Sequence, residues 1–440
     1  MQATKGPTRP RLIQAMIDAF RLPDLRKRIL ITFGIIVLSR FIAHIPLPGV
    51  DTTALHNLFQ NNALLGMLDM FSGGAMRNFS VAAMGVYPYI TASIVIQLLI
   101  PVIPYLQNLS QEGEAGQARM NRITHWLTVP MAGLSGWGQL ALLQRAGIVG
   151  STTPLATVSM IMALIAGTIF LVWLGELITE YGIGNGVSII IFAGIVAGYP
   201  QLVQSGLLSG SAVSGTIAYG LISIATVVAI VIFTEAHRRV PVQYAKTVFR
   251  GGRMYRQSGA THIPLRVNAA GMIPLIFAMS IVLFPGVIAS YFQPAVGQPA
   301  NAATWIVNNL TPNALGPIAG IYWGSYFLLC IGFTFFYTWV IFQQQDLPGT
   351  LQKQGGFVPG VRPGKHTADF FNHVINRITW AGALYLGIIA VMPFLAREIT
   401  NVQAIQLSST GLLIVVGVVL DTMKQMEAQL VMRRYEGFIK

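Results

Sequence analysis

Two glycine-rich stretches and seven histidines are the residues of this sequence most able to support chemistry. Gly182-Ile183-Gly184-Asn185-Gly186 looks like a nucleotide-binding loop, but it lacks the third glycine at the required offset. The run from Gly360 to Lys365 is one residue short of a phosphate loop, and His366 stands where serine or threonine is needed. The histidines form no metal pair at helical spacing, and no Ser/His/Asp set is suggested. We therefore predict no catalysis, metal or cofactor, and interpret the first stretch as a tight turn between two membrane crossings.

The composition is typical of a membrane protein. Hydrophobic residues make up 53% of the 440 residues and charged residues only 10%, whereas soluble domains average about 25% charged residues. Apolar runs recur along the whole chain, so we expect an all-α polytopic protein with one integral domain. The net charge of +13 would suggest nucleic acid in a soluble protein. Here the basic residues lie between the apolar runs, so membrane topology explains them better.

Ten apolar runs are candidates for crossing a bilayer, which takes about 20 helical residues. They are Leu30–Ile45, Ala82–Ile103, Ile123–Leu143, Leu155–Ile178, Val187–Val203, Thr216–Phe233, Ala269–Phe292, Ile318–Phe342, Ile378–Leu395 and Leu407–Met423. Before them, Ile13, Met16 and Phe20 recur at helical spacing in a basic lead, which is typical of an amphipathic helix lying on the membrane surface. This lead has no small-residue cleavage site, so no cleaved signal peptide is expected.

Basic residues set the predicted orientation, because cytoplasmic loops carry an excess of lysine and arginine. With both termini in the cytoplasm, all but four of the 28 basic residues fall on the cytoplasmic side. The four exceptions are Arg40, Arg77, Arg145 and Arg397. The chain then divides into 1–28 (cytoplasmic lead), 29–204 (five crossings), 205–236 (the sixth crossing and its external lead), 237–267 (basic cytoplasmic loop), 268–423 (four crossings with the cytoplasmic loop 343–376) and 424–440 (cytoplasmic tail).

One stretch between the first two crossings is unusual. The apolar segment from Asn62 to Met70 is too short to cross a bilayer, and a glycine pair and Arg77 follow it. Non-helical backbone at membrane depth is tolerated only where it is buried in protein or lines a watery cavity. The stretch is therefore either a half-helix inside a pore or a simple external loop, and these residues alone leave both alternatives open.

The loops 237–267 and 343–376 carry features that a simple connection does not need. The first holds seven basic residues and no acid, and the second contains a proline- and glycine-rich turn around Arg362. Such residues impose a defined turn. We interpret both loops as docking surfaces for an acidic or polyanionic partner; the alternative is positive-inside charge with attraction to anionic lipid. The docking residues are Arg238, Arg239, Lys246, Arg250, Arg253, Arg256, Arg362 and Lys365.

The crossings lack ionisable residues in their interiors, and their acids cluster near the ends, as at Glu180 and Asp421. Secondary transporters usually carry ionisable groups at mid-membrane because coupling ions need them. A channel that is closed by an apolar constriction fits this sequence better. A secondary solute transporter remains the alternative function.

Several motifs, in their order along the chain, resemble the signatures of the SecY family, the central subunits of the bacterial protein-translocation channel. They are Ile45-Pro46-Leu47-Pro48-Gly49-Val50, Met70-Phe71-Ser72-Gly73-Gly74, Tyr87-Pro88-Tyr89-Ile90, Trp173-Leu174-Gly175-Glu176, Ile178-Thr179-Glu180 with Gly182–Gly186, Phe192-Ala193-Gly194-Ile195-Val196, Pro359-Gly360-Val361-Arg362-Pro363-Gly364 and Gly411-Leu412-Leu413-Ile414-Val415-Val416. Each motif is weak alone, and together they cover nearly the whole chain.

The resemblance implies ten transmembrane helices in two pseudo-symmetric, inverted five-helix halves around a central pore. It implies a lateral gate with crossings two and three on one side and crossings seven and eight on the other. It implies a pore ring of Val86, Ile90, Val187, Ile191, Ile276 and Ile414. It implies a plug at about 64–74 that includes Leu64, Leu65, Met67, Leu68, Met70, Phe71, Ser72, Gly73 and Gly74. Thr91 and Asn268 match polar positions at the lateral gate.

The function implied by the resemblance is a passive channel in the bacterial cytoplasmic membrane. Unfolded secretory polypeptides would cross it, and apolar segments would leave it sideways into the membrane lipids. The implied partners are the small membrane subunits SecE and SecG, the SecA motor ATPase and the ribosome. Such a channel is not an enzyme, so a partner must supply the energy.

Overall fold

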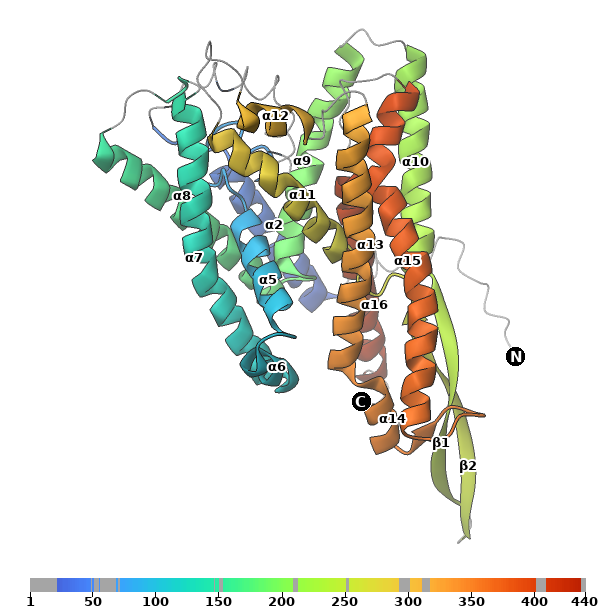
Figure 1. Cartoon of the computed structure of the whole chain (residues 1–440). Coiled ribbons are helices and arrows are strands. Elements are labelled where there is room, and N and C mark those ends of the chain that lie inside the picture. Colours follow the sequence, from blue (N-terminus) through green and yellow to red (C-terminus); the bar gives the residue numbers. More distant parts are fainter. Residues whose placement is uncertain are drawn as a thin grey trace.

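The computed structural model is a bundle of long helices with one β-hairpin at one end (Figure 1). It describes residues 22–48, 50, 55, 69, 72–145, 147–149, 153–208, 213–250, 253–292, 301–310, 317–400 and 409–436. The long helices are α2 (Pro23–Ile42), α5 (Tyr87–Leu99), α7 (Glu114–Arg145), α8 (Pro154–Tyr181), α9 (Gly186–Leu208), α10 (Val213–Glu235), α11 (Ile273–Tyr291), α13 (Pro317–Gln345), α15 (Lys365–Thr400) and α16 (Ser409–Glu436). The short helices α6 (Pro104–Gln111) and α14 (Leu347–Lys353) lie at the same end as the hairpin, and α12 (Ala302–Asn309) lies at the other end.

Each of the ten predicted crossings overlaps one of the long helices. Among the described residues, three helices are long and apolar enough to cross a membrane alone, namely Pro154–Tyr181, Gly320–Lys353 and Lys365–Ala396. Helices α5 and α6, bent by 101° at their junction, would make a fourth crossing if counted together. The count of ten and the division into two halves therefore stay predictions. The predicted surface helix around Ile13 lies outside the described residues.

Helix α5 is shorter than the predicted crossing Ala82–Ile103. It begins only at Tyr87, because Pro88 lacks a backbone N–H and its ring clashes with a helical carbonyl four residues earlier. Residues 81–86 form turns, in which the Gly85 N–H donates to the carbonyl of Ala82 at 2.8 Å. The predicted start of this crossing is therefore wrong by about one helical turn.

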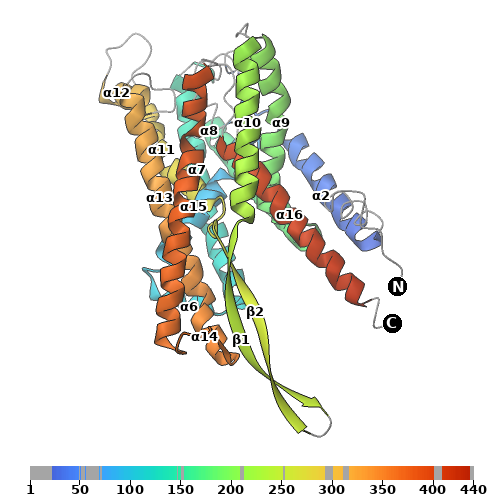
Figure 2. The same cartoon turned by 90° about the vertical axis from the view of Figure 1, so that its right-hand side faces the viewer.

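The all-α expectation is wrong for the basic loop 237–267. This loop forms a β-hairpin of β1 (His237–Arg250) and β2 (Arg253–Arg266), in antiparallel register from His237↔Arg266 to Arg250↔Arg253. The short strand β3 (Gly356–Phe357) pairs with β1 opposite Gln243 and Tyr244, giving the order β2-β1-β3. Figure 2 shows the hairpin projecting away from the helices. The two loops interpreted as docking surfaces thus contribute strands to one sheet.

Buried side chains form three hydrophobic clusters. The largest joins side chains of α5, α8, α9, α10, α11, α13, α15 and α16 at the centre of the bundle. A second cluster joins α7 and α8 to residues 76–84. A third lies under the sheet, where Val240 and Val242 of β1 meet Leu351 of α14 and Phe371 of α15. The tight turn expected between two crossings is confirmed, since residues 182–185 separate α8 from α9.

Candidate functional site

The structure brings the six residues expected to form the pore ring into one hydrophobic cluster. Val86, Ile191, Ile276 and Ile414 are buried members of the central cluster, and Ile90 and Val187 pack against it. We call these six residues the neck cluster. They come from α9, α11, α16 and the beginning of α5. That they surround a pore stays a prediction.

Local sequence explains how each helix contributes to the neck cluster. Val86 caps the beginning of α5, and Ile90 follows four residues later. Val187 and Ile191 have the same spacing on α9. Side chains four residues apart lie on the same face of a helix, so each pair presents two apolar groups to the same neighbours. Ile414 has no exposed surface and Val86 is 1% exposed, whereas Ile90 and Val187 are only partly buried.

The two residues expected at the lateral gate, Thr91 and Asn268, differ in their hydrogen bonding. The Thr91 hydroxyl donates to the carbonyls of Tyr87 and Pro88 within its own helix, at 3.1 and 2.9 Å. The Pro88 carbonyl is thus bonded by a side chain of the same helix. Asn268 lies between β2 and α11 and is 8% exposed. Its side-chain oxygen is buried and has no hydrogen-bond partner among the described residues. Their gate role stays a prediction.

Most of the expected plug lies outside the described residues, namely Leu64, Leu65, Met67, Leu68, Met70 and Phe71. The described part contains Ser72, Gly73 and Gly74, together with Asp69 just before them. Both glycines have positive φ angles, 67° and 84°, a left-handed conformation that glycine adopts without a steric penalty. The glycine pair therefore serves a turn, as its residue type suggests.

Asp69, which the sequence analysis did not single out, organises this turn. Arg77 Nη2 lies 3.2 Å from its Oδ2, and the Arg77 backbone N–H donates to Oδ1 at 2.9 Å. The Ser72 hydroxyl lies 3.3 Å from the same Oδ1. The Asp69 side chain is 3% exposed and that of Arg77 is 31% exposed. Burial raises the pKa of the Asp69 carboxyl, and Arg77 opposes that rise by stabilising the ionised form.

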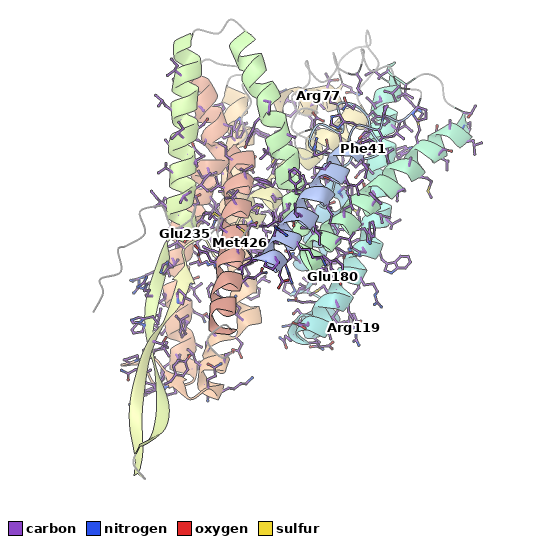
Figure 3. All side chains as sticks on the ribbon, turned by 180° about the vertical axis from the view of Figure 1, so that it is seen from behind. Phe41, Arg77, Arg119, Glu180, Glu235 and Met426 are labelled. Carbon is purple, nitrogen blue, oxygen red and sulfur yellow. The ribbon has the colours of Figure 1, made fainter. Side chains whose placement is uncertain are left out.

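Two further residues hold the turn against the bundle. The Arg40 guanidinium, in the last turn of α2, donates to the carbonyl oxygen of Gly73. On the other side Gly73 packs against Gly194 of α9, and a Cβ on Gly73 would lie only 2.5 Å from the Gly194 Cα. Figure 3 shows Arg77 and Phe41, which follows Arg40, toward the end opposite the hairpin. The only sequence signal for these contacts was that Arg40 and Arg77 are among the four basic residues expected outside the cytoplasm.

The residues expected to bind a partner lie along the three-stranded sheet and its turns, which we call the loop sheet. Arg238, Arg239, Arg362 and Lys365 are exposed. Lys246 and Arg250 are on β1, and Arg253 and Arg256 are on β2, close to the hairpin tip. In this register the backbone of Arg250 is opposite that of Arg253. The expected docking residues thus lie on one sheet and its turns.

Arg362 stands on a fixed backbone. Its carbonyl accepts a hydrogen bond of 2.9 Å from the buried Thr367 hydroxyl. The turn is flanked by Gly360 and Gly364, with φ angles of 82° and 95°. The Val361 N–H donates to the Val358 carbonyl at 3.1 Å. An exposed guanidinium is therefore presented by a backbone that its neighbours hold in place.

Comparisons with known proteins agree with this architecture. The family model for SecY matches residues 80–423. A protein translocase subunit SecY of Streptomyces scabiei is 42% identical over 448 residues, which cover 98% of this chain and all of that relative.

Two solved structures share the fold at low identity. One, described as "The plug domain of the SecY protein stablizes the closed state of the translocation channel and maintains a membrane seal", has a TM-score of 0.61 at 18% identity and covers 94% of this chain and 97% of its own. The other, "Sec61 in the Canine ribosome-channel complex from the endoplasmic reticulum", has a TM-score of 0.60 at 18% identity, with 98% and 96% covered. The family model and the relative decide the assignment: the chain belongs to the SecY family.

Proposed function

We propose that this chain is the pore-forming subunit of a protein-conducting channel. Unfolded secretory polypeptides would cross the membrane through it, and apolar segments would leave it sideways into the lipid. The observation that supports this function is that all six residues of the neck cluster, from α5, α9, α11 and α16, belong to or pack against the central hydrophobic cluster. In a SecY-family chain, this apolar setting fits a closed constriction better than a solute-binding site.

The chemistry of the neck cluster suits a seal that yields to a polypeptide. Hydrophobic constrictions exclude water and ions by dewetting. Apolar contacts have no directional bonds, so a chain that enters can displace these side chains without leaving buried polar groups unpaired. The channel is not an enzyme, and it breaks no bond itself. A partner must therefore supply the energy for transport.

The finer architecture that we propose has two five-helix halves. Between them lies a lateral gate, with α5 and α7 on one side and α11 and α13 on the other. Packing among these helices supports the proposal, because α11 contacts α7 as well as α13. Thr91 and Asn268 would lie at this gate. Residues 64–74 would be the plug, for which the close approach of Gly73 to α9, the helix of Ile191, is the supporting contact.

The partners that we propose are the small membrane subunits SecE and SecG, with the SecA motor or a ribosome on the loop sheet. The membrane would be the bacterial cytoplasmic membrane, with both termini in the cytoplasm. Exposed Arg238, Arg239, Arg362 and Lys365 support a polyanionic or acidic partner on the loop sheet. The structural neighbour described as a ribosome–channel complex is consistent with one such partner.

The decisive experiment is import into vesicles. The chain would be purified with its membrane subunits, reconstituted in phospholipid vesicles, and supplied with the motor ATPase, ATP and an unfolded secretory precursor. We expect the precursor to become protected from added protease, and empty vesicles serve as the control. Saturable uptake of a small solute without precursor import would instead support the alternative, a secondary solute transporter.

A further inference from the structure

We propose that a close crossing between α8 and α9 sets the position of Val187, a member of the neck cluster. Gly175 of α8 forms a seat against which the beginning of α9 rests, and the Thr32 hydroxyl of α2 holds the turn that precedes α9. The inference rests on the proposed channel function and deepens it, because it names residues that position the constriction without belonging to it.

The crossing is close because both helices carry a glycine where they meet. A Cβ on Gly186, the first residue of α9, would overlap the carbonyl oxygen of Gly175 and would lie 2.8 Å from the Ile178 Cβ. Both glycines are buried, and Ile178 has no exposed surface. Gly186 therefore cannot be given a side chain unless α9 moves away from α8.

The same crossing reaches the neck cluster directly. A Cβ on Gly175 would lie 3.0 Å from Val187 Cγ2, 3.1 Å from the Val187 backbone nitrogen and 3.3 Å from its Cα. Non-bonded carbon atoms are ordinarily about 3.5–4.0 Å apart. The space that a side chain at Gly175 would fill is therefore the space in which Val187 rests.

Hydrogen bonds fix the beginning of α9 at this crossing. The first four N–H groups of a helix have no partner within the helix. The Gly186 N–H donates to the Thr179 hydroxyl oxygen at 2.9 Å, and that hydroxyl donates to the Gly175 carbonyl at 3.0 Å. The Ser188 N–H donates to the side-chain oxygen of Asn185 at 3.1 Å. One hydroxyl of α8 thus joins the two glycines, so α9 cannot slide along α8 without breaking these bonds.

The turn before α9 is tied to α2 in the same manner. The Ile183 N–H donates to the Thr32 hydroxyl oxygen at 3.1 Å, and the Thr32 hydroxyl donates to the Arg28 carbonyl at 2.9 Å. Ile183 is 4% exposed. Removing the Thr32 hydroxyl would therefore leave a buried N–H group unpaired, which is unfavourable. Thr32 is the contact through which α2 holds this turn in place.

The seat affects more than one residue of the neck cluster. Val187 directly follows Gly186, and Ile191 lies four residues later on the same face of α9. Because close-packed interiors transmit strain, a shift of the first turn of α9 would move both side chains. Gly175 is thus a positioning residue: it adds no side chain to the constriction, and its lack of one decides where Val187 lies.

Resting ion conductance of the reconstituted channel in a planar bilayer tests the seat. We expect it to rise roughly threefold with Gly175→Ala and roughly tenfold with Gly175→Val, because strain from overpacking grows with the added volume. The matched controls are Gly198→Ala and Gly198→Val on α9, where an added Cβ would meet no atom within 4 Å. Equal conductance in the Gly175 and Gly198 variants, at equal abundance, would overturn the seat.

Hydroxyl variants keep the test decisive if the Gly175 variants lower the protein's abundance. Thr32→Val keeps the shape of the side chain but removes the acceptor, so we expect faster amide hydrogen exchange in residues 183–186 and a higher resting conductance. Thr32→Ser should restore both. The control is Thr226→Val, since the Thr226 hydroxyl donates to the Ile222 carbonyl within its own helix. Faster exchange in Thr32→Val without a leak would show that the turn does not position Val187.

Precursor import separates this inference from the proposed function. A misplaced Val187 should let ions through while import continues, so the Gly175 and Thr32→Val variants should leak and still import. Loss of import and abundance without a leak would indicate a purely structural role and would overturn the inference. Failure of the wild-type chain to import would instead count against the proposed channel function.

Discussion

The neck cluster and the loop sheet are held together by different kinds of interaction, apolar contacts in the first and backbone hydrogen bonds in the second. The neck cluster consists of six apolar side chains that belong to or pack against the central hydrophobic cluster, where contacts are non-directional. The loop sheet is joined by a backbone ladder from His237↔Arg266 to Arg250↔Arg253, with β3 added at Gln243 and Tyr244. Beneath that ladder lies a small hydrophobic cluster of its own.

This difference matches what each region would have to do. Apolar contacts can be replaced by the side chains of a passing polypeptide, so a pore ring made of such residues, as proposed above, would be able to open and close again. Each broken ladder bond would expose a polar group and cost about 0.5–1.5 kcal/mol. The loop sheet should therefore keep its shape while a partner binds. Three predictions test whether closure and docking are separate in this way.

The largest effect is expected in the neck cluster. Replacing Ile90 and Ile191 together by serine removes roughly 3 kcal/mol of apolar burial in total, since Ile90 is only partly buried. We expect resting ion conductance in a planar bilayer to rise roughly 100-fold, because the dry state of the neck loses its advantage. The matched control replaces Val95 and Val196, which are on the same two helices and are each 37% exposed. Equal conductance in the two double variants would show that Ile90 and Ile191 do not form the seal.

A change beneath the loop sheet should impair docking without opening the neck. Phe371 of α15 is 1% exposed and belongs to the cluster under β1. Phe371→Ala should cost this local cluster about 3–5 kcal/mol. Motor binding and precursor import should fall several-fold, while resting conductance stays at the wild-type level. Phe357→Ala on β3, where the side chain is 39% exposed, is the control with little expected effect. A leak in Phe371→Ala would mean that the two regions are not separate.

The smallest structural change, and the most specific, is at Arg362. Arg362→Lys keeps the charge but loses the planar donor fork of the guanidinium. Because the side chain is exposed and the backbone is held by Thr367, we expect unchanged abundance and topology but about half the precursor import or less. Arg377→Lys, also exposed, is the control. Near-normal import by Arg362→Glu would rule out docking through this residue.

The long helices could be predicted because a run of about 20 apolar residues has few alternatives in a bilayer. The helix boundaries were less accurate where proline intervenes, as at Pro88. The hairpin was missed although an alternating pattern is present, since Val240 and Val242 are buried while Arg239 and Pro241 are exposed. Pro241 and Pro264 interrupt that pattern and argue against a strand.

Contacts between residues far apart in the chain could not be predicted from the sequence. The pairing of Gln243 with Phe357 joins residues more than one hundred positions apart, and no local sequence pattern predicts it. The same holds for Arg40 with Gly73 and for Gly73 with Gly194. The six residues of the neck cluster were named only through family resemblance, and their role as a pore ring stays a prediction. An isoleucine in a membrane helix looks the same whether it faces a pore, a neighbouring helix or lipid.

The membership of the loop sheet has a mechanical consequence. Strands β1 and β2 connect α10 to α11, β3 lies between α13 and α15, and none of the three strands is joined to a helix from α2 to α9. The base of the hairpin is closed where the Val267 N–H donates to the Ala236 carbonyl at 2.9 Å. The projecting hairpin is therefore joined along the chain to α10 and α11, and β3 ties its first strand to the segment between α13 and α15. In the arrangement proposed above, a force on the hairpin tip would be passed first to the α11 and α13 side of the lateral gate, and not to α5 or α7.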